Sequence, residues 1–485
     1  MNKGIKLSVA VTATLLLTSF ACANDETSKQ SLKTNYQLIY NEKPKSVDNF
    51  TDMFKEGLFY GRLRSNTFYW GWEKESTTQY NHATSGLGGS LVYKSAKYAD
   101  IDFTAGMYYS RGFFSVKSGD VSKFKPGAEV LSRFDYSNTG SQSMSVLGQA
   151  YLSYKGLAKT ELSVGRQLVE TFYTKSNDSK MIPNTFEGVV LKSKVIPDTA
   201  FDVAYLSAEK LRAHTESHSI LMYGDTASSS STKPQWSEND DSAMHKGLTY
   251  TALKAAGKST DAPLIVADIH NKSIPNLSFD AAYYAVPALI SEVMGELNYK
   301  VKMGSFSLTP GVRYMKQFDN GAGAVGGAAY DGTTTGYKDP TSLDSQAVMG
   351  RLVGVYNNFK LNLGYSQIMD EADLITPWRG FPTGGYTRSM ARYNWIANTK
   401  SYRAELSING NKTGVYKDVF TQISFLHTDS DESKGQYDEN YYYLGFVQNI
   451  PSLVDLQWRL RLGYTDTKKA DADSLDARFE LNYLF

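Results

Sequence analysis

Three things are scarce in this 485-residue chain: cysteine, long apolar runs and an excess of charge of either sign. Its single cysteine is Cys22. Beyond residue 20, no stretch approaches the roughly 18 consecutive apolar residues of a helical membrane span. The 51 basic and 50 acidic residues nearly cancel, which argues against a nucleic-acid partner, because nucleic-acid binders usually carry a basic excess.

The amino terminus has the pattern of a secretory signal peptide. Two lysines precede an apolar run at residues 7–20, and Ala21-Cys22-Ala23 supplies the small residues of a cleavage site. Residues 1–23 are therefore predicted to be removed on export, which would leave a mature chain without cysteine and exclude disulfides and thiol chemistry. Lipid attachment at Cys22 is the less favoured alternative, because the residues before it form a poor context for it.

The chain is instead rich in aromatic residues and glycine, with 34 tyrosines, 23 phenylalanines and 39 glycines. Apolar and polar residues alternate with the period of two that marks strands, and helical periodicity is scarce. Together with the clear segments given next, weaker runs at 247–254 and 264–269 bring the expected total to about 18 strands. This number is within the known range for membrane barrels. The clear alternating segments are 58–70, 87–95, 101–109, 146–154, 161–169, 187–195, 201–207, 277–286, 292–301, 306–317, 347–356, 360–368, 402–408, 419–427, 441–448, 456–464 and 475–485.

The connections between these segments are of two kinds. Turns such as those at 302–305 and 356–359 are short, whereas the loops at 110–145, 226–242 and 321–345 are long and polar. Short turns on one side and long loops on the other are typical of membrane-spanning barrels.

The last segment shows the alternation most clearly. Tyr483 and Phe485 share one face with four other apolar residues, polar residues occupy the opposite face, and only Leu484 breaks the pattern. A soluble sandwich could show the same alternation. The export signal, the strand number and the aromatic strand ends together favour a lipid-facing barrel, whose backbone is satisfied only by ring closure.

The predicted fold is therefore all-β: a transmembrane antiparallel β-barrel of about 18 strands, with short periplasmic turns and long extracellular or inward-folded loops. We expect the last strand to close against the segment 58–70. After the signal peptide at 1–23, residues 24–56 are predicted to form a short N-terminal segment with one small amphipathic turn or helix, and residues 57–485 the barrel.

One part of the chain resembles a known family. Residues 164–171 read VGRQLVET and residues 176–188 read SNDSKMIPNTFEG, a strand and loop similar to those of OprD-type outer-membrane porins, which are substrate-selective channels of Gram-negative bacteria. A looser similarity covers residues 54–64 and the strand that contains Arg459. The sequence departs from the family where Phe172-Tyr173 replaces a common proline, and where lysine replaces arginine at position 180.

The resemblance implies a monomeric barrel of 18 strands with inward loops, a row of basic residues on one wall and acidic groups opposite. Small carboxylate-bearing solutes, such as amino acids or organic acids, would diffuse through it. A guanidinium offers a carboxylate paired donors, and a series of such sites lets the anion move on without being trapped.

Candidate residues for this channel follow from the alternation and from the resemblance. Each arginine has an alternative role, because lumen-facing charges also hold a barrel wall in shape. The predicted basic row on the lumen face consists of Arg313, Arg403, Arg459, Arg461 and Arg478, to which Arg388 and Arg392 are added from a less regular segment. The predicted constriction-loop residues are Asp178, Lys180, Asn184 and Glu187.

Other chemistry finds little support. His214 and His218 have the spacing of two metal ligands on a helix but lack an HExxH motif and a third ligand, and no nucleophile elbow or phosphate loop is present. We therefore expect no enzyme activity, metal or cofactor.

The expected partners are outer-membrane lipid and lipopolysaccharide, the barrel-assembly machinery and small solutes, but not nucleic acid. The assembly state stays open between monomer and trimer. The alternatives are an adhesin or surface-structural barrel, and a general porin without selectivity.

Deleting Phe485 should lower the fraction of the protein that inserts into the outer membrane. The terminal aromatic residue, supported by Tyr483, resembles the signal that the assembly machinery reads. Heat-modifiable gel mobility of membrane fractions measures the inserted fraction, and Phe485→Tyr, which keeps an aromatic end, is the control. Unchanged insertion of the deletion variant would contradict this interpretation of the terminus.

Overall fold

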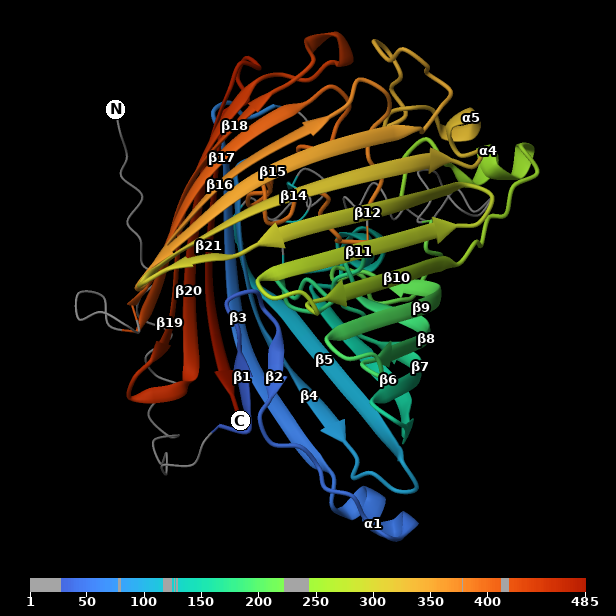
Figure 1. The fold of residues 1–485 in the computed structure, drawn as a ribbon, viewed down its shortest axis with the longest axis vertical. Helices are drawn as coiled ribbons and strands as arrows, with labels where there is room; N and C mark the ends of the chain where they lie inside the picture. The colour runs from blue at the N-terminus through green and yellow to red at the C-terminus, as the bar shows by residue number, and fades with distance from the viewer. Residues whose placement is uncertain are drawn as a thin grey trace.

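Eighteen antiparallel strands close into a barrel in the computed structural model (Figure 1). The structure describes residues 28–76, 80–116, 124, 125, 127, 130–221, 244–376, 378–410 and 418–485. The predicted signal peptide and the predicted loop at 226–242 lie outside these residues. Each wall strand pairs with its neighbour in sequence, and the last one, β21 (Ser474–Leu484), pairs with β3 (Leu58–Trp72). The predicted fold class and the predicted closure are both confirmed.

The wall strands follow one another around the ring in sequence order. Two of them, β12 (Ile290–Tyr299) and β13 (Val301–Met303), form one wall strand with a short break, since both pair with β14 (Phe306–Asp319). The first half of the wall continues from β3 with β4 (His82–Lys94), β5 (Ile101–Val116), β6 (Ser143–Leu157), β7 (Thr160–Gln167), β8 (Thr185–Ser193), β9 (Thr199–Lys210), β10 (Leu264–Asn271) and β11 (Leu277–Val286). The second half contains β15 (Ser345–Tyr356), β16 (Phe359–Ile368), β17 (Lys400–Asn409), β18 (Val419–Asp429), β19 (Glu439–Ile450) and β20 (Leu453–Thr467).

Short helices occur outside the wall. The weaker alternating run at 247–254 was expected to be a strand, but it contains the helix α4 (Tyr250–Ala255). Thr249 starts this helix, because its side chain accepts a hydrogen bond from the Ala252 backbone N–H at 3.0 Å. No helix in the described part of the chain is long and apolar enough to cross a membrane. The other helices within the described residues are α1 (Phe50–Lys55), α2 (Arg133–Thr139), α5 (Gly323–Gly326) and the 3-10 helix η3 (Glu432–Lys434).

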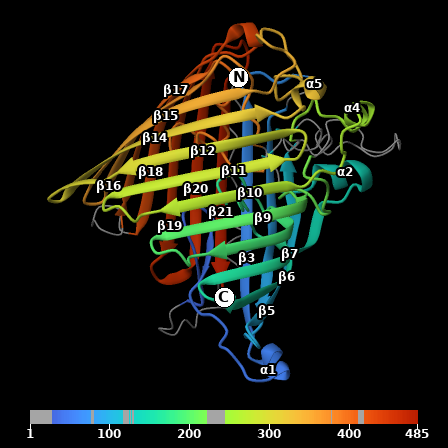
Figure 2. The same ribbon diagram turned by 45° about the vertical axis from the view of Figure 1, so that its right-hand side comes forward.

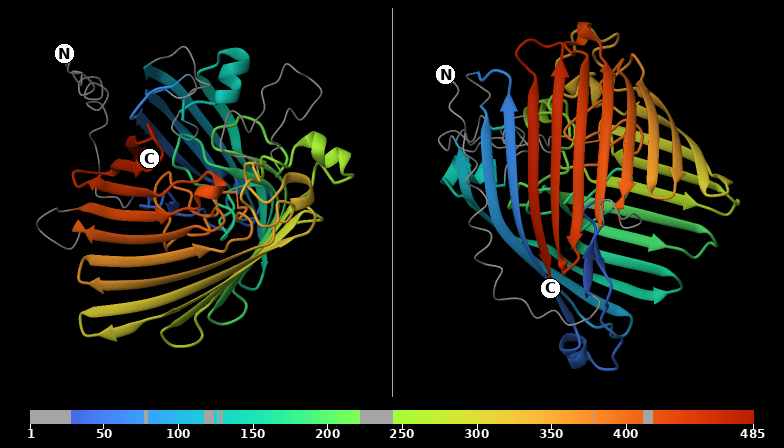
Figure 3. Two further views of the ribbon diagram at one scale, coloured as in Figure 1. Left: turned by 90° about the horizontal axis from the view of Figure 1, so that it is seen from above. Right: turned by 90° about the vertical axis from the view of Figure 1, so that its left-hand side faces the viewer.

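The connections at the two ends of the barrel differ in length. Tight turns such as 158–159 and 357–358 join the strands at one end, whereas at the other end long stretches of chain separate consecutive strands, as between Lys210 and Leu264, Asp319 and Ser345, and Ile368 and Lys400. The asymmetry predicted from the sequence is therefore confirmed. Figure 2 shows α4 and α5 in these long loops at the rim, and the view from above in Figure 3 shows loops gathered within the ring of strands.

The faces of β21 are those that the alternation predicts. Phe479 is 42% exposed on the outer surface and Phe485 54%, whereas Arg478 and Glu480 are buried inside. Leu484, which breaks the alternation, points inward and is 4% exposed. An apolar outer face and a charged inner face therefore alternate along this strand, as a lipid-facing barrel requires.

A small hairpin precedes the barrel and was not predicted. The strands β1 (Gln30–Leu32) and β2 (Leu38–Tyr40) pair only with each other, and α1, the expected short helix, follows them. The Gln30 side chain donates to the Gly61 carbonyl oxygen at 2.5 Å, and Gln457 donates to the Leu32 carbonyl oxygen at 2.9 Å. The N-terminal hairpin, residues 28–42, therefore lies against the inner face of β3 and β20.

One glycine lets a long loop approach the wall. Gly364 of β16 faces the interior, and a Cβ at this position would lie 2.3 Å from the Tyr386 carbonyl oxygen. Asn362 of the same strand donates to the Gly385 carbonyl oxygen at 3.1 Å. The loop 369–399 is therefore folded inward with its backbone against β16.

Candidate functional site: a constricted, charged lumen

Two long loops meet inside the barrel. They are the β7–β8 loop, residues 168–184, and the β16–β17 loop, residues 369–399. Thr174 and Arg379 form an isolated antiparallel bridge between them. The two loops therefore support each other through backbone contacts.

A buried aromatic cluster fixes this junction to the wall. Tyr173 and Trp378, one from each loop, are fully buried. The ring of Tyr284, from β11, lies 4.7 Å from Tyr173 and 5.1 Å from Trp378 between centroids. The Gly380 backbone N–H also donates to the Tyr173 carbonyl oxygen at 2.9 Å. Together these contacts hold both loops within the lumen.

Asp178 anchors the β7–β8 loop to the strand β3. Its Oδ2 accepts a hydrogen bond from Arg62 at 2.5 Å and its Oδ1 from Arg64 at 2.6 Å. All three side chains are buried. Burial alone would raise the pKa of the Asp178 carboxyl, but the charges of Arg64 and Arg62 outweigh it and hold the pKa below its ordinary value.

The N-terminal hairpin covers the two arginines of β20. Arg459 is 1% exposed and donates to the carbonyl oxygens of Lys33 and Thr34, the latter at 2.9 Å. The Tyr36 ring lies over both guanidinium groups, with its centroid 4.1 Å from Cζ of Arg459 and 5.1 Å from Cζ of Arg461. The hairpin therefore separates Arg459 from the open lumen.

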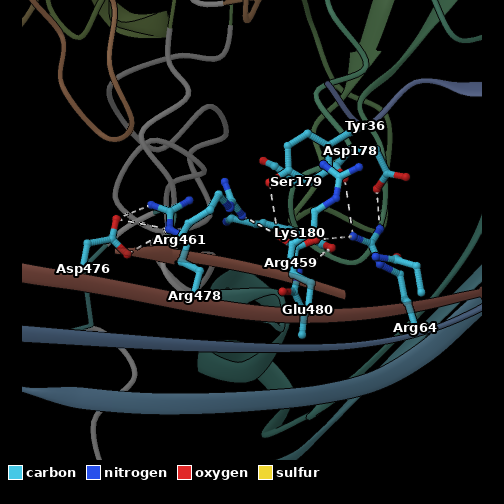
Figure 4. Close-up of polar contacts among 12 residues, drawn as sticks. Tyr36, Arg64, Asp178, Ser179, Lys180, Arg459, Arg461, Asp476, Arg478 and Glu480 are labelled. Carbon is cyan, nitrogen blue, oxygen red and sulfur yellow. Dashed lines mark hydrogen bonds and ion pairs between the residues drawn. The ribbon is translucent and has the colours of Figure 1, made fainter. Parts of the chain in front are cut away.

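Acidic groups on β21 lie close to the lumen arginines of β20 and β21 and offset their positive charge. Figure 4 shows part of this group of side chains. Glu480 pairs with Arg461 and accepts a hydrogen bond from the Tyr36 hydroxyl at 3.1 Å. Farther along the strand, Arg478 donates to Asp476 at 2.9 Å. The sequence alone showed no acid beside Arg461 on its own strand, and the acid that pairs with it belongs to the next strand.

Three other predicted arginines also have carboxylate partners. Arg403 pairs with Glu405 of the same strand, as its sequence spacing allowed. Arg392 donates to Glu439 of β19 at 2.8 Å. Arg313 donates to Glu296 at 2.8 Å, and also to the Pro382 carbonyl oxygen in the β16–β17 loop at 2.5 Å. Arg313 therefore links β12, β14 and this loop.

Arg388 differs from the other six arginines of the predicted basic row, because its neighbours among the described residues are aromatic rings rather than hydrogen-bond acceptors. Its Cζ lies 4.3 Å from the Phe381 ring centroid and 5.4 Å from that of Tyr393, and Trp395 packs on Tyr393 at 4.8 Å. Within the described residues, Arg388 forms no ion pair, and its Nε and Nη1 have no hydrogen-bond partner. Burial lowers the pKa of Arg388 to about 10, so the group remains charged at neutral pH.

The predicted constriction residues are in two places. Asp178, Lys180 and Asn184 belong to the β7–β8 loop, where Asn184 is fully buried and accepts a hydrogen bond from the Arg212 backbone N–H at 2.7 Å. Glu187 lies in β8 and pairs with Arg166 of β7. The loop ends earlier than the sequence suggested, because the β7–β8 ladder already includes Phe186.

Acidic side chains line the wall across the ring from β17–β21. Asp268 of β10 accepts a hydrogen bond from the Phe172 backbone N–H at 2.5 Å, which ties the β7–β8 loop to this wall too. Alternation places further carboxylates on the same inner face: Asp202, Asp280, Glu292 and Glu296.

Several residues that shape the lumen were missed from the sequence. Arg62 and Arg64 alternate with Leu63, and this pattern could have revealed their inward orientation. Arg351 donates to Glu296 at 2.7 Å, but its neighbours Met349 and Val353 are apolar, so no clear polar face was visible there.

The two spaced histidines pack against each other. His214 Nδ1 lies 3.0 Å from His218 Nε2. Burial lowers the pKa of His218 to about 4 and that of His214 well below its usual value, so both rings are neutral at neutral pH. Among the described residues, no group of three or more His, Cys, Asp or Glu side chains could hold a metal ion.

A closed transmembrane barrel of this size, with inward loops and charged inner walls, has the architecture of a porin. A family model described as "outer membrane porin, OprD family" matches residues 142–415, more than half of the sequence, so the chain belongs to the OprD family. The resemblance noted in the sequence is confirmed. The family and fold are those of channels rather than enzymes, and they place the protein in the outer membrane of a Gram-negative bacterium.

Solved porins share this fold at low sequence identity. OpdK of Pseudomonas aeruginosa, solved with vanillate, has a TM-score of 0.65 and 13% identity over 89% of this chain and 99% of its own. A BenF-like porin of Pseudomonas fluorescens Pf-5 has a TM-score of 0.67 and 13% identity, with the same coverage. OccAB3 of Acinetobacter baumannii has a TM-score of 0.66 and 13% identity, over 89% of this chain and all of its own. A search of curated proteins finds no match.

Asp178→Asn should loosen the β7–β8 loop. The substitution leaves Arg62 and Arg64 buried without their carboxylate, which costs about 3–5 kcal/mol in the free energy of unfolding. Denaturant unfolding of the purified protein measures this cost. Asp471→Asn is the matched control, because its pair with Lys74 is exposed at both ends and contributes about 0–1 kcal/mol. Equal stability of the two variants would contradict the anchoring role.

Proposed function

We propose that this porin is selective for small carboxylate-bearing solutes, such as amino acids and organic acids, which diffuse past a row of arginines on one wall. The single observation that carries the proposal is Arg388, a charged guanidinium inside the barrel with no carboxylate partner among the described residues. A buried donor without an acceptor is costly, so an anion that satisfies it gains free energy on arrival.

Neighbouring charges extend this site along the wall. After burial, which is the larger cause, the charges of Arg478 and Arg392 also lower the pKa of Arg388. An anion at Arg388 would therefore also lie near these two guanidinium groups, whose own carboxylate partners are Asp476 and Glu439. The proposed row contains Arg388 and its neighbours Arg478 and Arg392, together with the other predicted arginines Arg313, Arg403 and Arg461.

The aromatic rings around Arg388 suit a carboxylate with an apolar body. Phe381, Tyr393 and Trp395 form one cluster, with centroid distances of 5.9 Å for Phe381–Trp395 and 4.8 Å for Tyr393–Trp395. The OpdK structure contains vanillate, which is itself an aromatic carboxylate. We extend this ligand class to the present chain on the basis of the arginine and its aromatic neighbours.

Arg459 remains a proposed member of the row, behind the N-terminal hairpin. Its acceptors are neutral carbonyl oxygens of that hairpin rather than a carboxylate.

An adhesin would use the extracellular loops and would show little solute selectivity, and a general porin would respond to solute size alone. Selective block by a carboxylate therefore separates the three functions.

Arg388→Gln should weaken the block of single-channel current by benzoate or glutamate in a planar bilayer. The loss of one charged hydrogen-bonding partner, about 1.5–3 kcal/mol, corresponds to roughly 10–100-fold weaker binding. Lys74→Gln, at an exposed loop position, is the charge-matched control. Equal block of both variants would contradict the role of Arg388, and a folded wild-type protein that never conducts would favour the adhesin.

Tyr36→Ala should increase the anion preference of the open channel, because it uncovers the guanidinium groups of Arg459 and Arg461. The reversal potential in a salt gradient measures this preference. Tyr36→Phe keeps the ring over both arginines and loses only the hydrogen bond to Glu480, so it should behave like the wild type. If Tyr36→Ala shows an unchanged reversal potential, the hairpin does not screen these charges.

A further inference from the structure

The helix α1 presents two aromatic rings to the surroundings of the barrel. Phe50 and Phe54 lie four residues apart and therefore on one face of the helix, with ring centroids 5.2 Å apart. Phe50 is 63% exposed and Phe54 48%, whereas Met53 faces the protein and is 5% exposed. Asn49 caps the helix by accepting a hydrogen bond from the Asp52 backbone N–H at 2.9 Å.

Backbone contacts hold α1 in one orientation at the rim. The Val47 N–H donates to the Lys97 carbonyl oxygen at 2.9 Å, and the Lys97 N–H donates to the Lys45 carbonyl oxygen at 3.1 Å. The Ala96 N–H donates to the Met53 carbonyl oxygen at 2.9 Å. These bonds join the residues before α1, and Met53 within it, to the turn between β4 and β5, and so fix the orientation of the helix relative to the barrel.

The exposed rings continue the apolar outer surface of the wall. Tyr93, on the outer face of β4, donates its hydroxyl hydrogen to the Phe54 carbonyl oxygen at 2.7 Å. The Tyr93 ring also contacts Phe59 of β3, which is 57% exposed, at 4.9 Å between centroids. Phe50 in turn contacts Tyr98 at 6.3 Å. The aromatic pair on the outer face of the barrel is therefore joined to the aromatic pair of α1 through the hydrogen bond from Tyr93 to the Phe54 backbone.

The end of the barrel that carries α1 is the end with the short turns, which predicts that it faces the periplasm. In Figure 1, α1 lies beyond the ends of β4 and β5. Tyr and Trp gather at the level of the lipid headgroups because each combines an apolar ring with a polar group, and interfacial helices bury Phe side chains just inside the apolar boundary. The charged residues near α1 are of both signs: Lys43, Lys45, Asp48, Asp52, Lys55 and Glu56.

We propose that Phe50 and Phe54 insert into the periplasmic leaflet of the outer membrane, so that α1 is an interfacial anchor for the N-terminal segment. The occupant of this surface is phospholipid, because the surface is continuous with the lipid-facing wall. This anchor lies just after the N-terminal hairpin in the sequence and fixes one end of it. The proposal depends on the barrel fold and not on the solute that the channel carries.

Site-directed spin labelling tests the anchor in the full-length folded protein. Phe50→Cys labelled with a nitroxide and reconstituted into phosphatidylethanolamine–phosphatidylglycerol bilayers should be accessible to oxygen and protected from a water-soluble nickel chelate. Lys55→Cys, on the other side of the helix, is the matched control and should show the reverse. We expect the oxygen-to-nickel accessibility ratio to be several-fold higher at position 50 than at position 55.

Two outcomes would overturn the proposal. Equal nickel accessibility at positions 50 and 55 would show that the aromatic face lies in water in a bilayer without other proteins, as expected if a periplasmic protein or the cell wall covers it in the cell. A label at position 50 that is shielded from oxygen as well as from the nickel chelate would show that the protein itself covers it. Phe54→Cys repeats the measurement at the second ring, and gel mobility confirms that each labelled barrel is folded.

Discussion

Closure of the ring by β21 and β3 is the constraint on which the rest of this structure depends. A strand in lipid has no water to satisfy its backbone, so both of its edges must find a neighbouring strand. At the end of this seam, Gly61 and Phe485 exchange backbone hydrogen bonds of 2.8 and 3.0 Å. The absence of a side chain at Gly61 leaves room for the Phe485 ring. Once the ring is closed, each strand has one face toward lipid and one toward the lumen.

Closure brings many charges into a confined interior, and most of them are paired. Buried ions are stable only with partners, and the partners come from neighbouring strands or inward loops. Glu480 of β21 forms an ion pair with Arg461 of β20, and Asp178 of the β7–β8 loop forms ion pairs with Arg62 and Arg64 of β3. The ion pairs that neutralise the wall therefore also hold the constriction in place.

Much of the wall could be predicted because its pattern is local. A period of two is visible in any short segment, and it correctly placed Arg478 inside and Phe479 outside. The N-terminal hairpin could not be predicted, because it is held by single bonds between distant residues, such as Gln457 to the Leu32 carbonyl oxygen, 425 positions apart. The partner of Arg461 was missed for the same reason, since register between strands is absent from a single strand's sequence.

The arginines of the lumen differ in the acceptors that they already have, and this decides what a solute can gain from them. Arg461 has the carboxylate of Glu480, Arg459 has neutral carbonyl oxygens, and Arg388 has only aromatic rings among the described residues. A solute carboxylate must compete with the Glu480 carboxylate at Arg461, but with no fixed carboxylate of the described residues at Arg388. Attraction that varies along the wall, strong at one point and weak at its neighbours, lets an anion enter and leave without being trapped.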